Sequence, residues 1–127
     1  MPRDPGRPAD EPAPASPTGA CDAVPLHRPF DAFRWAATAL HPYKEDGAAP
    51  FKAITRQTLF SRPDLAGELR YFEIAAGGYS TLERHQHVHG VMILRGRGRA
   101  LVGSAILDLA PCDLVTVPPM TWHLFRA

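Results

Sequence analysis

The sequence predicts an all-β domain built as an antiparallel sandwich or barrel. From Phe51 onward, apolar and β-branched residues occur in short runs of strand length. Gly and Pro turns separate these runs, and no apolar pattern of helical period lies between them. The length of 127 residues is that of one domain rather than two.

The first element in chain order is a proline-rich tail. Six of the 14 prolines fall within the first 20 residues, which contain no Val, Ile, Leu or aromatic residue. Such a segment buries too little apolar surface to offset the entropy lost on ordering. We therefore predict a disordered tail over residues 1–28 and a folded domain over residues 29–127. Residues 30–40 would form either a short helix or a segment laid over the body, with Phe33 and Trp35 as its anchors.

The remaining elements are predicted strands separated by turn residues. Turns are expected at Gly77-Gly78, at Gly96 and Gly98, at Gly103, and at Pro118-Pro119. The strand-length runs are Ala53–Phe60, Leu69–Ala75, Glu83–Leu94, Arg99–Val102, Ala105–Leu109, Leu114–Val117 and Thr121–Phe125.

Composition excludes several classes of function. Fourteen Lys and Arg residues oppose 13 Asp and Glu residues, which leaves a net charge of +1 and no basic footprint for nucleic acid. The longest apolar runs are too short to span a bilayer, and no secretory signal opens the chain. Cys21 and Cys112 form neither a metal-type pair nor a disulfide framework. We expect a cytoplasmic protein whose partner is a small molecule, without nucleic acid or membrane.

A run of potential metal ligands stands out in the last third of the chain. On a strand, alternate residues share a face, so ligands at every second position would project to one side. Val91 and Ile93 continue this face, which is therefore apolar deeper in and polar at one end. A solvated strand with outward histidines explains the run equally well, but His123, which follows a rigid Pro-Pro turn, favours a divalent metal. The alternating ligands are Glu83, His85, His87 and His89.

Two segments resemble the signature motifs of the cupin superfamily. The first motif is Gly, five residues, His-x-His, three or four residues, Glu, six residues, Gly. Its spacing is met here, with Glu in place of the first His and His in place of the Glu. The matching positions are Gly77, Glu83, His85, His89 and Gly96.

The second motif is Gly, five residues, Pro-x-Gly, two residues, His, three residues, Asn. Its frame is also met, with both glycines and the Asn replaced. The resemblance covers about residues 68–127. The matching positions are Cys112, Pro118, Met120, His123 and Ala127.

This resemblance implies a small antiparallel jelly-roll β-barrel with a metal site inside it. Carried over by position, the ligands are Glu83, His85, His89 and His123. His87 would replace Glu83 through a bulge, leaving Glu83 to orient an imidazole. We rank His85, His89 and His123 first, His87 next and Glu83 last. The nitrogen-rich set suits Fe, Mn, Ni, Cu or Zn in the divalent state.

The resemblance implies a metal-binding cupin that acts on a small molecule as an oxidoreductase of dioxygenase type. The alternatives are a non-catalytic cupin that binds or senses a small ligand, and a truncated family member with an impaired barrel. The chain ends four residues after His123, where cupins usually continue with another strand. In the truncated alternative this final strand is missing and a sheet edge is open. We expect a homodimer, which would cover such an edge.

Overall fold

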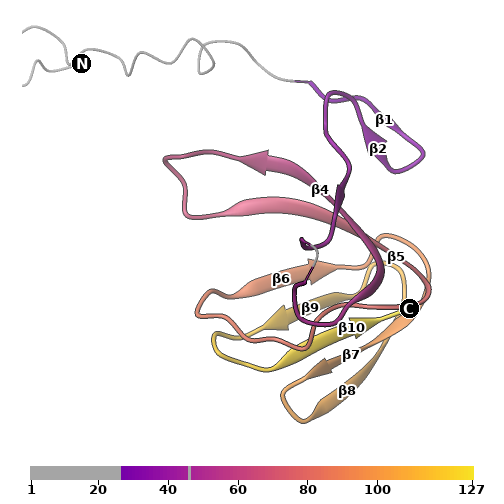
Figure 1. Ribbon diagram of the computed structural model, residues 1–127, viewed down its shortest axis with the longest axis vertical. Coiled ribbons are helices and arrows are strands. Elements are labelled where there is room, and N and C mark those ends of the chain that lie inside the picture. Colours follow the sequence, from indigo (N-terminus) through magenta and orange to yellow (C-terminus); the bar gives the residue numbers. More distant parts are fainter. Residues whose placement is uncertain (1–26, 46) are drawn as a thin grey trace, which may run out of the picture.

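A computed structural model describes residues 27–45 and 47–127 of the chain (Figure 1). All regular structure in these residues is β-strand, which confirms the predicted all-β class. None of the described segments is a helix able to cross a membrane. The predicted tail lies outside the described residues except for His27 and Arg28. Arg28 donates hydrogen bonds to the Ala37 carbonyl at 2.7 Å and to the Thr38 hydroxyl at 2.9 Å.

The strands of the described residues form three antiparallel sheets. The largest has the order β3-β4-β5-β10-β7-β8, and two smaller sheets pair β6 with β9 and β1 with β2. In chain order the strands are β1 (Phe30–Asp31), β2 (Arg34–Trp35), β3 (His41–Pro42), β4 (Lys52–Ser61), β5 (Glu68–Tyr79), β6 (His89–Met92), β7 (Gly98–Val102), β8 (Ala105–Leu109), β9 (Leu114–Val117) and β10 (His123–Arg126).

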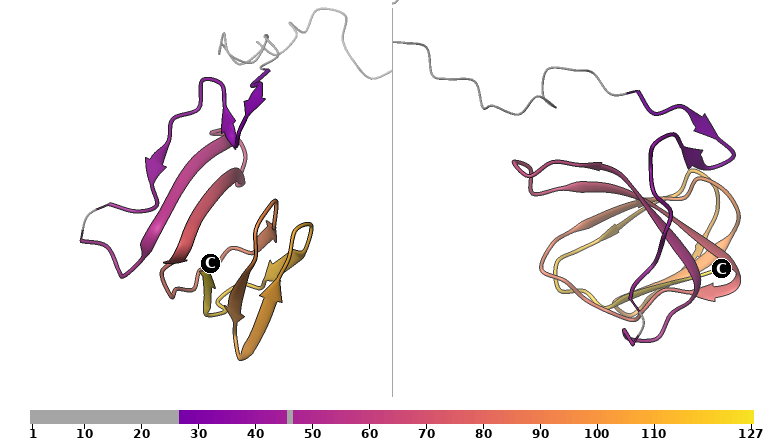
Figure 2. Two further views of the ribbon diagram at one scale, coloured as in Figure 1. Left: turned by 90° about the vertical axis from the view of Figure 1, so that its right-hand side faces the viewer. Right: turned by 45° about the horizontal axis from the view of Figure 1, so that its top comes forward.

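The core lies between the β7–β8 end of the large sheet and the β6–β9 pair, which curve around each other (Figure 2). Alternation on β9 shows how the sequence selects this face. Val115 and Val117 are buried, whereas Leu114, the first residue of the strand, points to the other face and is 66% exposed. The other members of the core are Ala100 and Leu109, with Val91, Ile93, Val102, Leu107 and Phe125 packed against them.

Residues 30–35 form a two-stranded hairpin and not the helix that the sequence also allowed. Ala32 and Phe33 occupy the left-handed region, with φ of 46° and 60°, and make the turn. The rings of Phe33 and Trp35 lie 5.8 and 5.1 Å from the ring of Tyr71 on β5. The hairpin therefore lies over the body with Phe33 and Trp35 as anchors, which was the second prediction for this segment.

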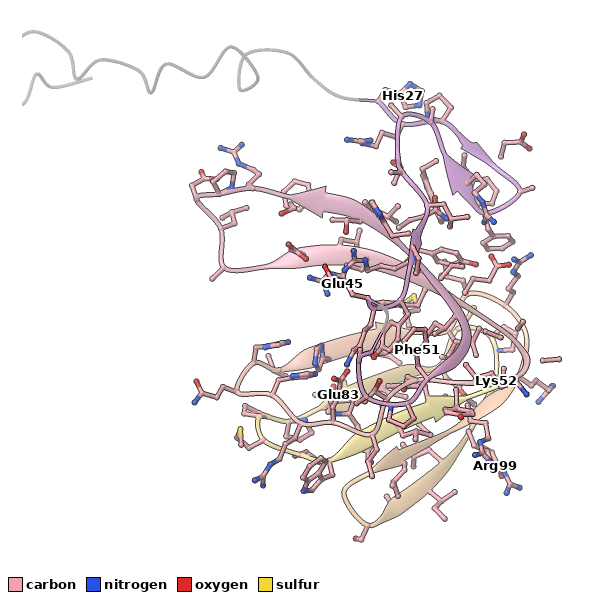
Figure 3. All side chains as sticks on the ribbon, viewed as in Figure 1. His27, Glu45, Phe51, Lys52, Glu83 and Arg99 are labelled. Carbon is pink, nitrogen blue, oxygen red and sulfur yellow. The ribbon has the colours of Figure 1, made fainter. Side chains whose placement is uncertain are left out.

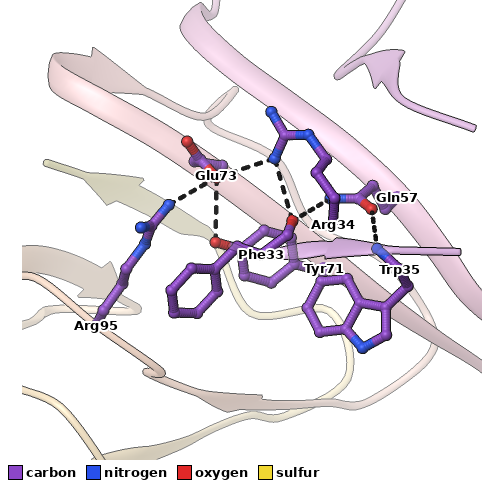
Figure 4. A network of polar contacts seen from close by, with 7 residues as sticks. All are labelled: Phe33, Arg34, Trp35, Gln57, Tyr71, Glu73 and Arg95. Carbon is purple, nitrogen blue, oxygen red and sulfur yellow. Dashed lines mark hydrogen bonds and ion pairs between the residues drawn. The ribbon is translucent and has the colours of Figure 1, made fainter. Parts of the chain in front are cut away.

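A buried amide fastens this hairpin to the large sheet (Figure 4). Gln57 on β4 is 1% exposed, donates to the Phe33 carbonyl at 2.8 Å and accepts from the Trp35 amide at 3.4 Å. Beside it, the Glu73 carboxylate accepts hydrogen bonds from Tyr71, Arg34 and Arg95. One face of the β4–β5 hairpin is thereby occupied by the N-terminal segment.

The predicted strand from Glu83 to Leu94 is wrong over its first half. Only His89–Met92 is a strand, and Glu83 makes an isolated bridge to His123. Beyond this bridge, the backbone before β6 bonds to a distant turn, since the Met120 amide donates to the His85 carbonyl at 2.5 Å. The last predicted strand begins at His123 rather than at Thr121, because Thr121 still belongs to that turn.

Candidate metal centre

Four histidines gather at one end of the core. Their ring centroids lie between 4.5 and 5.3 Å apart in the pairs that contact each other. His85, His87 and His89 each place one potential ligand atom within 4.8 Å of the other two. Glu83, His85 and His123 form a second such group with the same limit of 4.8 Å. The structure thus brings together all five residues that the sequence predicts as ligands.

Two strands and one bridge position the cluster. His89 opens β6 opposite the buried Val117 of β9, so that its side chain stands at the end of the core. His123 opens β10, and its amide donates to the Glu83 carbonyl at 2.9 Å. The Glu83 amide returns a bond to the His123 carbonyl at 3.2 Å. These two bonds hold the loop carrying Glu83 and His85 against the end of β10.

Glu83 is the carboxylate of the cluster, and two residues outside the motifs hold it. The Tyr43 hydroxyl donates to Glu83 Oε1 at 2.8 Å, and Lys44 Nζ forms an ion pair with Oε2 (Figure 3 marks Glu83 below the β4–β5 hairpin). Burial acts to raise the pKa of Glu83, but the hydrogen bonds from Lys44 and Tyr43 together outweigh it and lower this pKa. Glu83 therefore remains ionised near neutral pH.

The same carboxylate faces the imidazole of His85, with Glu83 Oε1 3.5 Å from His85 Nε2. This distance exceeds that of a normal hydrogen bond, so neither atom is committed to the other. The rings of His85 and His87 are stacked with their centroids 4.8 Å apart.

His89 and His123 are the two cluster members on strands. Burial, and then the charges of His87 and His123, lower the pKa of His89 and so favour its neutral form. In the described part of the chain, His89 Nε2 is buried and has no hydrogen-bond partner. The Nδ1 atom of His123 lies 2.9 Å from the Thr121 carbonyl. Because a carbonyl only accepts, the proton of neutral His123 sits on Nδ1, and the lone pair on Nε2 is left for a metal.

These donors fit a divalent transition metal. A buried imidazole nitrogen without a partner is costly unless something binds it, and here it lies among three further imidazoles and an ionised carboxylate. Neutral imidazole suits Fe, Mn, Ni, Cu and Zn, and the chemistry of the donors does not separate these ions. Surface hollows of the described residues lie elsewhere, one along β3 and β4 and one at the β7–β8 edge.

Solved structures with a similar fold and sequence identify the family. A cupin 2 conserved barrel domain protein from Rhodopseudomonas palustris is 57% identical, with a TM-score of 0.73, over 80% of this chain and 71% of that one. A cupin-2 domain protein from Rhodospirillum rubrum is also 57% identical, with a TM-score of 0.69, over 82% and 70% of the two chains. The chain belongs to the cupin superfamily.

Among curated proteins, this cupin is similar to the 1-methylthio-D-xylulose 5-phosphate methylsulfurylase of Rhodospirillum rubrum, with 61% identity over 101 residues. The match spans 79% of this chain but only 65% of that relative, so the chain covers less than two thirds of the relative's length. No family profile matches the chain.

Two cupin motif positions that usually hold glycine adopt a backbone conformation that favours glycine. Cys112 has φ of 72° and Met120 has φ of 56°, in the left-handed region that disfavours side chains. Met120 is also the residue whose amide bonds to His85. The turn that bonds to the loop of Glu83 and His85 therefore has a left-handed residue at the position where the motif has glycine.

Tyr43 and Lys44 are the residues of the site that motif reasoning missed. They lie just after β3, about 40 residues before Glu83 in the sequence. Their segment contains Pro42, Gly47 and Pro50 and looks like an ordinary loop. No local spacing connects them to the histidines. Only the pairing of β3 with β4, in which the Tyr43 amide donates to the Ile54 carbonyl, brings them there.

Proposed function

We propose that this cupin is a metal-dependent enzyme whose substrate is a small phosphorylated ketose carrying a thioether. The observation that carries the proposal is the 61% identity to a protein named for 1-methylthio-D-xylulose 5-phosphate. The cluster of four imidazoles and one carboxylate supports it, because such a site leaves coordination positions open for an oxygen-rich substrate. A ketose offers a carbonyl and a neighbouring hydroxyl, which together can chelate a divalent ion.

The roles of the side chains follow from their surroundings. His85, His89 and His123 would hold the ion, with His87 or Glu83 completing the set. A bound divalent metal would supply Lewis acidity toward the substrate carbonyl. Glu83, with its lowered pKa, is a poor proton donor, so we assign it to binding and orientation rather than to acid–base catalysis.

Tyr43 completes this assignment. Burial, and then the neighbouring Glu83, raise the pKa of the Tyr43 hydroxyl, which keeps its proton throughout the neutral range. The hydroxyl is thus a permanent donor to Glu83. It holds the Oε1 atom of Glu83, and the ion pair with Lys44 holds the Oε2 atom.

The decisive experiment begins with metal analysis of protein purified without added metal. The protein with its measured metal content is then incubated with 1-methylthio-D-xylulose 5-phosphate, and binding and conversion are followed by calorimetry and phosphorus NMR. We expect about one metal per chain, binding of the sugar phosphate, and loss of both in the His123→Ala variant. Full metal occupancy without binding of this compound would refute the proposed substrate class.

The dioxygenase-type reaction expected from the motif resemblance predicts a different result. Oxygen consumption by the metal-loaded protein with phenolic, thiol or dicarbonyl compounds would replace the proposed ketose chemistry with that reaction. Binding of the sugar phosphate without conversion would instead support the non-catalytic sensing role. The homodimer predicted from the sequence is tested separately, by light scattering coupled to size-exclusion chromatography.

A further inference from the structure

One face of the β4–β5 hairpin carries the hairpin β1–β2, and the opposite face leads to the candidate metal centre. Arg56 on β4 pairs directly with Phe72 on β5, so their side chains lie on the same face. The Phe72 ring lies 5.7 Å from the ring of Tyr43, whose hydroxyl bonds to Glu83. Arg56 is therefore on the face that looks toward the metal centre.

Register also gives the spacing between Arg56 and the site. The Tyr43 amide bonds to the carbonyl of Ile54, two residues before Arg56 on β4. At about 3.3 Å per residue, Arg56 is roughly 7 Å further along the strand than the point where Tyr43 is attached. Arg56 thus lies along the sheet face that carries Tyr43, outside the candidate ligand set.

The electrostatic state of Arg56 sets it apart from the neighbouring cations. Lys44 is paired with Glu83, Arg70 with Glu68 at 2.5 Å, and Arg95 with Glu73 at 2.9 Å. The hydrogen bond from Arg70 lowers the pKa of Glu68, and the charge of Arg56 also helps to lower it, but Glu68 is already paired with Arg70. Arg56 Nε itself is buried and makes no hydrogen bond within the described part of the chain. A buried guanidinium donor without an acceptor is destabilising unless a ligand supplies one.

We infer that Arg56 binds the phosphate group of the substrate while the ketose end of the same molecule reaches the metal centre. This inference rests on the proposed function. A guanidinium fork matches the oxygens of a phosphate, and charge-assisted bonds of this kind are the stronger class of hydrogen bond. In a pentulose 5-phosphate three carbons separate the phosphate oxygen from the ketone, which suits an anion site next to a metal site rather than within it.

The test compares two probes, D-xylulose 5-phosphate and D-xylulose, by calorimetric titration of the metal-loaded full chain. Wild-type protein should prefer the phosphorylated probe. Arg56→Met should weaken binding of D-xylulose 5-phosphate by about 10- to 100-fold, the range of a lost charge-assisted hydrogen bond, and leave D-xylulose binding unchanged. Arg99→Met is the matched control, because Arg99 lies on β7, pairs with Asp108 and is 70% exposed. It should change neither affinity.

Each other outcome overturns a distinct step. If wild type prefers the phosphorylated probe and Arg56→Met retains that preference, the role of Arg56 is wrong and the proposed substrate class stands. If wild type binds neither probe, the proposed function fails and the inference fails with it. If Arg56→Met does not fold or loses its metal, Arg56→Lys takes its place. Lysine keeps the charge without the fork, so an intermediate loss of phosphate preference supports the inference and an unchanged preference refutes it.

Discussion

Replacing Tyr43 by Phe tests whether the residues outside the cupin motifs hold the metal centre together. The substitution removes one hydrogen bond to Glu83, 2.8 Å long, and keeps the ring that contacts Phe51 and Phe72. A hydrogen bond to a charged group contributes about 1.5–3 kcal/mol. Because Lys44 still neutralises Glu83, we expect the lower part of this range, about 1.5 kcal/mol less stability. For a domain of this size the melting temperature should fall by roughly 5–10 °C.

The metal affinity of the same variant separates an orienting role from a purely structural one. Loss of a partner that orients a metal-site residue typically costs about 10- to 100-fold in affinity, and Tyr43→Phe should lie at the lower end because Lys44 remains. Competition with a chromophoric chelator measures this value. Tyr71→Phe is the matched control, since Tyr71 donates to Glu73 at 3.2 Å in a similar way but on the face of the β4–β5 hairpin that carries Phe33 and Trp35.

The pH dependence of stability gives a third measurement on Tyr43→Phe. The pKa of Glu83 is lowered in the folded state, so its stabilising contribution is present above the unfolded value near 4.5 and is lost as pH falls through the folded value. Without the Tyr43 hydroxyl the folded pKa of Glu83 rises, and the loss of stability on acidification becomes smaller. Equal metal affinities in Tyr43→Phe and Tyr71→Phe would refute the orienting role, whatever the melting temperatures show.

Three further predictions concern the cluster and its supporting turn. His123→Ala should remove most metal uptake, measured by elemental analysis, whereas His27→Ala should retain it; equal retention would exclude His123 as a ligand. Metal should dissociate as pH falls through the histidine range, because protons compete for the imidazoles. The pKa of His89 is lowered below its usual value of 6.5, so protonation of His89 on the acid side costs both folding stability and bound metal. Metal that stays bound well below the histidine range would point to carboxylate or thiolate ligands. Met120→Gly should raise the free energy of unfolding, measured by chemical denaturation, by about 0.5–1 kcal/mol. A left-handed non-glycine residue costs roughly 1–2 kcal/mol, and the greater freedom of glycine in the unfolded chain cancels part of the gain from removing this cost. A destabilised variant would show that packing of the Met120 side chain outweighs its backbone strain.

The fold was predictable because its signals are local. Runs of β-branched residues between Gly and Pro turns indicated strands near β4, β5 and β7 to β10, and the boundaries differ from those observed by a few residues. The pairing of these strands was not predictable from such runs. The order β5-β10-β7 places the last strand between two earlier ones, and that choice depends on contacts between distant segments.

The candidate site shows how a correct group of residues can follow from an incorrect local conformation. The alternation argument placed Glu83, His85 and His87 on one face of a continuous strand with His89, but these three lie in a loop. They converge because the bridge from Glu83 to His123 and the bond from Met120 to His85 fold the loop over the end of the core. These long-range bonds join residues of the first motif to residues of the second, so the spacing of the two motifs predicts them. Alternation along a single strand does not. Spacing between two motifs is therefore the stronger predictor of this cluster. It has no counterpart for Tyr43, which reaches Glu83 through a sheet edge that carries no motif.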